Sequence, residues 1–255
     1  MRVLRSEWTK LRSLRSTWLV AAVILVLGVG LGALTSSALG SGYATLSAEE
    51  RADWNPMVAG LPTLLITQLA VGVLGVLVIT GEYATRTIQP SVVAVPRRGR
   101  LYAAKAVVLG GLALVLGQLV GFASFFVGQA LIAGHGAPHA VLGQPDVLRA
   151  VVGGGLYLSA IALLGFGFGA IVRSTAGGIG LIVGATLLVR LIAQALPAGL
   201  SDWMDRYWPT AAGEKIISVV PEAGALAPWT GFALLCAFVA AACVAGYVLL
   251  RTRDT

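Results

Sequence analysis

The 255-residue sequence predicts an all-α membrane protein with six transmembrane helices, an N-terminal amphipathic helix in the membrane interface, and both termini in the cytoplasm. Two observations carry this prediction. The chain contains six long apolar stretches that are free of charge, apart from Arg190 in the fifth. Each is long enough to supply the ~20 residues that cross the hydrocarbon core as a helix. The charged segments between these stretches alternate in sign along the chain.

Lysine and arginine determine the predicted orientation, because the cytoplasmic loops of membrane proteins carry an excess of both. With the N-terminus inside, cytoplasmic segments hold most of the 18 basic residues: Arg2, Arg5, Lys10, Arg12, Arg15, Arg86, Arg97, Arg98, Arg100, Lys105, Arg173, Arg251 and Arg253. The other side holds most of the 11 acidic residues: Glu49, Glu50, Asp53, Asp146, Asp202, Asp205, Glu214 and Glu222. A nucleic-acid patch is the alternative explanation for the net charge of +7, and it is disfavoured because the basic residues stand at the ends of apolar spans.

Composition predicts a single transmembrane domain over residues 1–255. Charged residues make up only 11% of the chain, about half the usual ~25% of soluble domains. The apolar run after Trp18 is too long for the core of a secretory signal and predicts an anchored first helix. Cys236 and Cys243 stand seven residues apart on the last predicted helix, ~10 Å along its axis, which is too far for a disulfide within one chain.

The N-terminal segment, 1–17, is predicted to be an amphipathic helix that lies in the membrane interface. Its apolar stripe consists of Leu4, Trp8, Leu11, Leu14 and Trp18. Glu7 and Arg15 also fall within this stripe, which favours a protein partner on that face, while snorkelling of their side chains to the lipid headgroups remains the alternative. The candidate functional residues of this helix are Glu7, Trp8, Lys10, Leu11 and Arg15.

The six transmembrane helices are predicted at 18–40, 59–80, 105–132, 149–172, 177–197 and 230–250. Two glycine pairs with small-xxx-small spacing, Gly117/Gly121 and Gly180/Gly184, predict close helix packing. Between the fifth and sixth helices, segment 198–229 combines prolines with Trp203, Tyr207 and Trp208. Because aromatic residues favour the membrane interface, we expect short re-entrant or interfacial helices on the outer side here.

Motifs of soluble enzymes are missing from the sequence. The Gly213-Glu214-Lys215 triplet lacks the spacing and the preceding strand of a phosphate-binding loop. His135 and His139 are four residues apart, but Gly136 and Pro138 between them argue against the helix that would align them as metal ligands. The sequence therefore predicts no catalytic residue and no metal site.

Arg190 is the one clear charge inside a predicted span. An ionisable group within the membrane is a functional hypothesis by default, with Asp202 or Asp205 as candidate partners and Gln194 one turn further out. Arg190 and Gln194 are thus candidates for gating or for cargo contact. Snorkelling of Arg190 to the outer interface is the alternative.

The longest internal cytoplasmic segment, 81–104, combines the apolar residues Ile88, Val92, Val93 and Val95 with the basic residues Arg97, Arg98 and Arg100. A topology anchor needs only the basic residues. The apolar residues ahead of them favour a short amphipathic helix that inserts into a cleft on a cytoplasmic partner.

Three blocks give the chain a family resemblance: SEWTKLRSLRSTW at 6–18, EY…TI…PRR…AAK across 82–105, and APWTGFALLCAF…LLRTRD across 227–254. Taken together, in this order and spacing, they resemble the permease subunit of a bacterial ABC transporter of the ABC-2 type, in the form common in actinobacteria. The resemblance implies the ABC-2, or type V exporter-like, permease fold in the bacterial cell membrane.

It also implies two permease subunits, identical or different, that work with two separate ATPase subunits. ATP and Mg would be bound by those subunits, and this chain would bind no cofactor. The coupling residues implied in the 81–104 loop are Glu82, Thr87, Ile88, Val92, Pro96, Arg97 and Arg98. The chain has Arg86 where the family usually has glycine, and Gln89 where a basic residue is common.

A permease subunit of an ATP-driven exporter is the function that these observations favour. A membrane sensor or scaffold of the same fold, without transport, is the first alternative. A membrane-embedded enzyme that works at the outer Asp/Arg cluster is the second.

Overall fold

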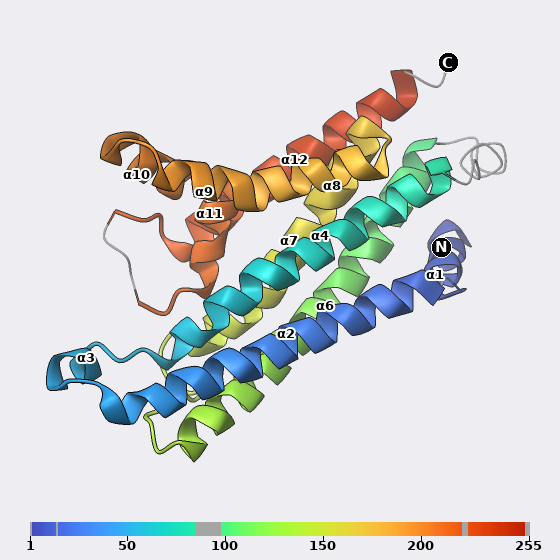
Figure 1. Cartoon of the computed structure of the whole chain (residues 1–255). Coiled ribbons are helices and arrows are strands. Elements are labelled where there is room, and N and C mark those ends of the chain that lie inside the picture. Colours follow the sequence, from blue (N-terminus) through green and yellow to red (C-terminus); the bar gives the residue numbers. More distant parts are fainter. Residues whose placement is uncertain (1, 14, 85–97, 221–223, 253–255) are drawn as a thin grey trace.

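The computed structural model describes residues 2–13, 15–84, 98–220 and 224–252, and every regular element in these ranges is a helix. Six helical segments are long and apolar enough to cross a membrane, as predicted. They are α2 (Arg15–Gly42), α4 (Gly60–Ala84), α6 (Arg98–Gly134), α7 (Val147–Val172), the continuous segment α8 (Thr175–Val183), η3 (Gly184–Leu188) and α9 (Val189–Gln194), and α12 (Pro228–Thr252). Figure 1 shows them as a bundle of long helices that run between two common ends.

Shorter helices complete the chain. The N-terminal α1 (Arg2–Ser13) precedes α2, and η1 (Tyr43–Thr45), α3 (Ala48–Ala52) and η2 (Pro56–Ala59) connect α2 to α4. Three more, α10 (Ala198–Tyr207), α11 (Pro209–Glu214) and η4 (Lys215–Ile217), lie between α9 and α12, and we call these three the cap. A capping box starts α3: the Ser47 hydroxyl accepts from the Glu50 amide, and the Glu50 carboxylate accepts from the Ser47 amide.

Several helices differ in length from the predicted spans. The third begins at Arg98 instead of 105, and the second continues to Ala84 beyond 80. Hydrophobicity marks only the part of a helix that lies in hydrocarbon, whereas the helix itself can continue into water with charged residues. The fifth span contains a π-helical turn, η3, and ends at Gln194 instead of 197, because Pro197 starts the extended turn into α10.

The two ends of the bundle differ in charge. One end, which we call the basic end, holds α1, the start of α6, the turn between α7 and α8, and the end of α12 (Figure 1). The opposite end, which we call the acidic end, holds α3 and the cap. The elements at the acidic end carry Glu49, Glu50, Asp53, Asp202, Asp205 and Glu214. The described members of the two predicted charge groups therefore lie at opposite ends of one bundle.

Helix α7 lies at the centre and packs against α4, α6 and α12. Its side chains Tyr157, Ile161, Leu164 and Phe166 are fully buried. The predicted Gly117/Gly121 pair brings α6 onto α7, since a Cβ at Gly117 would lie 2.8 Å from the Gly155 carbonyl oxygen. The pair Gly180/Gly184 does not pack as predicted: a Cβ at either position would meet nothing within 4 Å among the described residues.

Helices α4 and α7 make the closest crossing in the bundle core, and it depends on glycine. A Cβ at Gly165 would lie 2.2 Å from the Gly72 carbonyl oxygen, whereas a Cβ at Gly30 would meet nothing within 4 Å. We predict that Gly165→Val lowers the unfolding free energy by about 3 kcal/mol, at the upper end of overpacking effects, because the two backbones must separate. Thermal unfolding in lipid nanodiscs measures this, with Gly30→Val as the control. Equal stability of the two variants would contradict the crossing.

Candidate functional site

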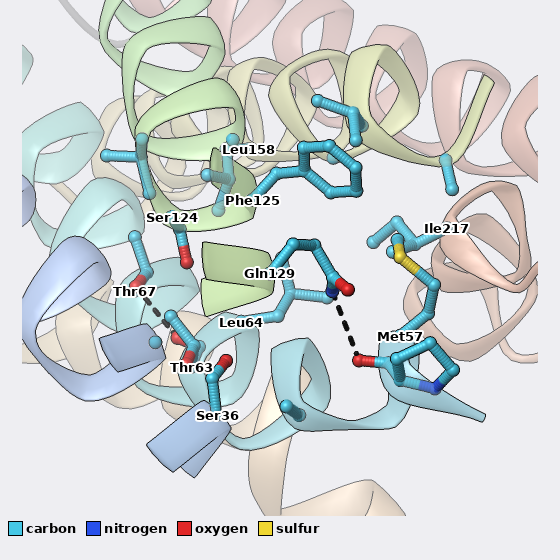
Figure 2. Close-up of a pocket in the computed structure, with 18 residues that line it drawn as sticks. Ser36, Met57, Thr63, Leu64, Thr67, Ser124, Phe125, Gln129, Leu158 and Ile217 are labelled. Carbon is cyan, nitrogen blue, oxygen red and sulfur yellow. Dashed lines mark hydrogen bonds between the residues drawn. The ribbon is translucent and has the colours of Figure 1, made fainter. Parts of the chain in front are cut away.

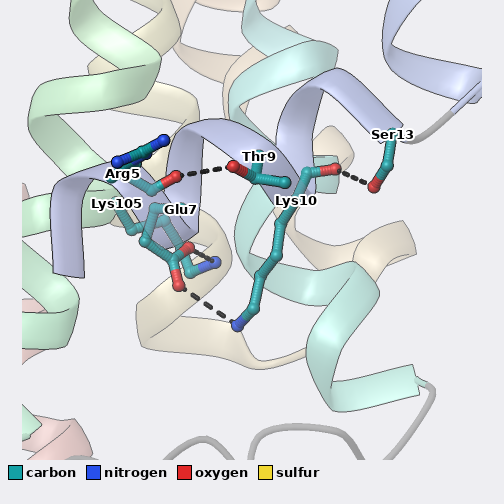
Figure 3. A network of polar contacts seen from close by, with 6 residues as sticks. All are labelled: Arg5, Glu7, Thr9, Lys10, Ser13 and Lys105. Atoms are coloured by element: carbon teal, nitrogen blue, oxygen red, sulfur yellow. Dashed lines mark hydrogen bonds and ion pairs between the residues drawn. The ribbon is translucent and has the colours of Figure 1, made fainter. Parts of the chain in front are cut away.

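A buried ion pair joins α1 to α6 at the basic end. Lys105 Nζ lies 2.6 Å from Glu7 Oε2, and Lys10 Nζ lies 3.1 Å from Glu7 Oε1 (Figure 3). Glu7 is 1% exposed and Lys105 is 4% exposed, so the two charges are almost entirely shielded from water by protein atoms. We call Glu7, Lys10 and Lys105 the α1 anchor.

The α1 anchor shows which group pairs with Glu7, the acidic residue within the apolar stripe of the N-terminal helix: it is Lys105. Glu7 contacts helix α6 of its own chain, so neither lipid headgroups nor a second protein is needed to explain its position. Leu11 is buried beside this contact, whereas Trp8 and Arg15 are exposed. The stripe residues Leu4, Trp8 and Trp18 line an apolar groove with α2 and α6.

The predicted coupling segment is only partly described. Thr87, Ile88, Val92, Pro96 and Arg97 lie outside the described residues. Glu82 lies in the last turn of α4, and Arg98 is the first residue of α6. The segment therefore leaves and re-enters the bundle at the basic end, and Lys105 of the α1 anchor follows Arg98 by two helical turns, ~10 Å.

The start of α6 is also fixed to the last span. The Tyr102 hydroxyl donates to the Cys243 carbonyl at 2.9 Å, and the Tyr102 ring packs against Phe166 of α7. At Gly99, a Cβ would lie 2.8 Å from the Tyr247 hydroxyl. The first part of α6 is therefore in direct contact with α1, α7 and α12.

The second charged cluster lies at the acidic end. Arg190 Nη1 of α9 lies 2.6 Å from Glu214 Oε2 of α11. The Arg190 side chain is 38% exposed and that of Glu214 is 11% exposed. The partner is thus Glu214 and not Asp202 or Asp205, which are both exposed, although Asp205 lines the same small pocket. Gln194 is exposed and lies outside this pocket, so it does not extend a polar track from Arg190.

The π-helical turn of the fifth span forms part of the same contact. In η3 the Val189 amide donates to the Gly184 carbonyl five residues earlier, which widens the turn. The Ala185 carbonyl in this turn accepts from Trp208 Nε1 at 2.7 Å and from Thr210 Oγ1 at 3.0 Å. The cap is therefore joined to the fifth span by an ion pair and by two hydrogen bonds.

Arg149 joins the cap to the central helix. Its guanidinium donates to the Ile216 carbonyl and to the Ser218 carbonyl, each at 2.9 Å, and it pairs with Asp146 at 3.0 Å. Neither this role of Arg149 nor that of Glu214 was predicted from the sequence. The only signal in the sequence was weak: small residues precede Glu214, as they do where helices pack closely. The structure has such a contact, since a Cβ at Gly213 would lie 2.5 Å from Leu235 Cδ2 of α12.

Among the described residues, no three His, Cys, Asp or Glu side chains lie together in a way that could hold a metal ion. His135 Nε2 lies 3.3 Å from the Ser37 hydroxyl, at the end of α6. Cys236 is exposed and Cys243 is half-buried, and both are free.

Removing the charge of Arg190 tests whether the attachment of the cap matters for function. We predict that Arg190→Leu leaves the protein assembled but lowers, roughly fivefold, the transport that the family resemblance implies, which is the lower end of typical coupling effects. The leucine breaks one of three contacts between the cap and the fifth span and leaves Glu214 without its guanidinium. Gln194→Leu, one turn away at an exposed position, is the matched control. A normal transport rate in Arg190→Leu would remove Arg190 from the functional residues.

These features define a multi-pass helical membrane protein whose two bundle ends carry opposite charge. The family model of the ABC-2 family transporter proteins matches residues 3–188, most of the chain. The protein therefore belongs to the ABC-2 family of transporter membrane proteins, and in such systems ATP is hydrolysed by a separate ABC ATPase subunit. No curated protein matches the chain. The matched range covers nearly all of α1 and the coupling segment and ends at Leu188, the last residue of η3, so α9, the cap and α12 lie beyond it.

Proposed function

We propose that this chain is the permease subunit of an ATP-driven exporter in the bacterial cell membrane. In this proposal two permease subunits, identical or different, associate with two ATPase subunits that bind ATP and Mg. The basic end faces the cytoplasm, in accordance with the excess of lysine and arginine on cytoplasmic segments. The coupling segment 81–104 contacts the ATPase.

The observation that carries the proposal is the arrangement around the start of α6. The coupling segment enters α6 at Arg98, and the next two turns contact α1 through Lys105 and α12 through Tyr102. A displacement of the segment is then transmitted as movement of rigid, packed helices. ATP-dependent closure of the ATPase pair would favour one of two bundle arrangements, as alternating access requires.

The acidic end contributes the second part of the mechanism. The cap rests on α9 and α7 through Arg190 and Arg149. The cap thus contacts two spans of one bundle, α9 and α7. A change in the angle between these two helices would stretch or break the contacts of Arg190 and Arg149 with the cap. We infer that the cap opens and closes the outer exit while the coupling segment follows the ATPase.

The proposed orientation predicts a labelling pattern. In a background in which Cys236 and Cys243 are alanine, single cysteines that replace Ser47 and Ser218 should react with a membrane-impermeant maleimide on intact cells. Cysteines that replace Ser91 and Thr252 should react only after the cells are opened. Labelling of Ser91→Cys in sealed cells would contradict the orientation.

The function itself is tested by ATP hydrolysis in lipid. The chain and its ATPase, reconstituted together in nanodiscs, should hydrolyse ATP, and a subset of compounds from a chemically diverse panel should stimulate the rate. An assembled complex whose hydrolysis responds to no compound, with no movement of any compound in sealed vesicles, would favour a sensor or scaffold over an exporter.

A further inference from the structure

A cavity of about 100 Å³ lies near the acidic end, between α2, α4, α6 and α7 (Figure 2). It is separate from both charged clusters, since its lining includes no residue of the α1 anchor and neither Arg190 nor Glu214. The described residues that line it carry no charge at all. Because an ion pays a desolvation cost of several kcal/mol in an uncharged site, this cavity selects against charged ligands.

The lining has a polar side and an apolar side. In Figure 2 the hydroxyl-bearing side chains gather at the left of the cavity: Ser36, Thr63, Thr67 and Ser124. The apolar side chains of Phe125 and Ile217 lie above its centre and at its right. Such a wall, mostly apolar with a few polar groups, is typical of sites that bind small molecules.

Thr63 provides the polar group that remains available. The residue is 4% exposed, and its hydroxyl has no hydrogen-bond partner among the described residues. Other buried helical threonines, Thr67 and Thr186, donate to the carbonyl four residues earlier, at 2.7 and 2.6 Å. For Thr63 that carbonyl belongs to Ala59, the last residue of the 3₁₀ turn η2, and the Thr63 hydroxyl forms no hydrogen bond with it. Leaving a buried hydroxyl unpaired costs ~1–3 kcal/mol, so a ligand atom that pairs with it recovers that energy.

Gln129 has a different role at the same cavity. Its Nε2 donates to the Pro56 carbonyl at 3.3 Å, and its Oε1 accepts from the Ala140 amide at 2.7 Å. Both ends of the side chain are therefore used to hold η2 and the loop after α6 beside the cavity. Gly154 of α7 leaves the remaining room, because a Cβ there would meet nothing within 4 Å.

We propose that this cavity binds a small, neutral, largely apolar molecule whose hydroxyl or carbonyl oxygen hydrogen-bonds to Thr63. At about 100 Å³ the cavity is smaller than the ~150 Å³ that holds one benzene ring, so it accommodates the hydroxyl or ester end of a ligand with a few carbons, and the rest of a longer ligand must lie outside it. Two sources share this chemistry: a free small alcohol or ester, and the glycerol-ester end of an uncharged membrane lipid. The proposal does not depend on the exporter function, because binding is measured on the permease chain without ATP.

The test uses photolabelling of the full-length chain in phosphatidylcholine nanodiscs with a diazirine derivative of 1-octanol. Mass spectrometry should locate adducts on the lining residues, such as Leu64 and Phe125. Gly154→Leu, which fills the cavity, should abolish these adducts. Gly30→Leu makes the same change at an exposed position of α2 and should leave them unchanged.

A second variant keeps the test decisive if Gly154→Leu fails to fold. Thr63→Val preserves the shape and removes the hydroxyl, so the probe concentration for half-maximal labelling should rise roughly fivefold to tenfold, the loss of one hydrogen bond. Thr67→Val, whose hydroxyl already bonds within α4, should raise it by less than about twofold.

Two further measurements distinguish the sources of the ligand. Competition by excess 1-octanol supports a free small molecule, and a diacylglycerol that co-purifies with the native chain but not with Gly154→Leu supports a lipid. The proposal is overturned if the adducts lie only on lipid-facing residues such as Val26 and are the same in Gly154→Leu and Gly30→Leu. It is also overturned if Thr63→Val labels with an unchanged concentration dependence.

Discussion

Ile88→Asp is expected to detach the ATPase or to uncouple it from the permease, and it should do so far more severely than Arg100→Ala. Ile88 lies in the coupling segment outside the described residues, and Arg100 is exposed in the first turn of α6. If Ile88 is an anchor buried against the ATPase, an aspartate there loses the apolar contact and buries a charge. Losing an anchor of this kind can cost ~2 kcal/mol or more, whereas a charge at the rim usually costs less.

The measurement is co-purification of the ATPase with the tagged chain, followed by ATP hydrolysis in lipid. Ile88→Leu serves as a matched control, because it keeps an apolar side chain of the same volume. A fully coupled ATPase in the Ile88→Asp complex would show that segment 81–104 is not the coupling element.

Glu7→Leu is the second substitution with a large expected effect. It leaves Lys105 buried without the carboxylate that lies 2.6 Å away, and both side chains are at least 95% buried. Removing one member of a buried ion pair costs ~3–5 kcal/mol, while replacing both members by apolar residues can be nearly neutral. We therefore expect Glu7→Leu and Lys105→Met to lower stability by about 3 kcal/mol each, and the double variant by much less than either.

Thermal unfolding in nanodiscs measures the three variants, and protease accessibility of α1 reports whether that helix has separated from α6. Lys10→Met is the control, since the Lys10 side chain is 42% exposed and a pair screened by water is worth less than about 1 kcal/mol. A double variant that is as unstable as the sum of the two singles would contradict a direct pairing of Glu7 with Lys105.

The spans were predictable from the sequence because hydrocarbon imposes a simple rule on length and composition. The run without charge between Arg149 and Arg173 indicated α7, and the structure has that helix from Val147 to Val172. The same rule does not predict how far a helix extends beyond the hydrocarbon core into water. The start of α6 at Arg98, seven residues before the predicted span, was therefore not predicted.

Pairings between distant residues were harder to predict. Arg190 stood out because a charge is rare in a span, but its partner Glu214 stands in a polar segment with several other acids. Glu214 becomes the partner of Arg190 because α11 packs back against the bundle and places this carboxylate beside α9. The unpaired hydroxyl of Thr63 was equally invisible, because it depends on how η2 and the start of α4 place the carbonyl groups around it. Glu7 stood out in the sequence as a charge within an apolar stripe, but its partner Lys105 on α6 could be found only from the fold.

The central claim is that this chain works as the membrane subunit of a transporter that is driven by a separate ATPase. The most direct measurement is ATP hydrolysis by material purified through a tag on this chain from gently solubilised membranes. We expect an ABC ATPase to co-purify in equal amount, with hydrolysis that is lost when the catalytic glutamate of that ATPase is replaced by glutamine. A chain that purifies in its folded state with no ATPase and no hydrolysis would contradict the account.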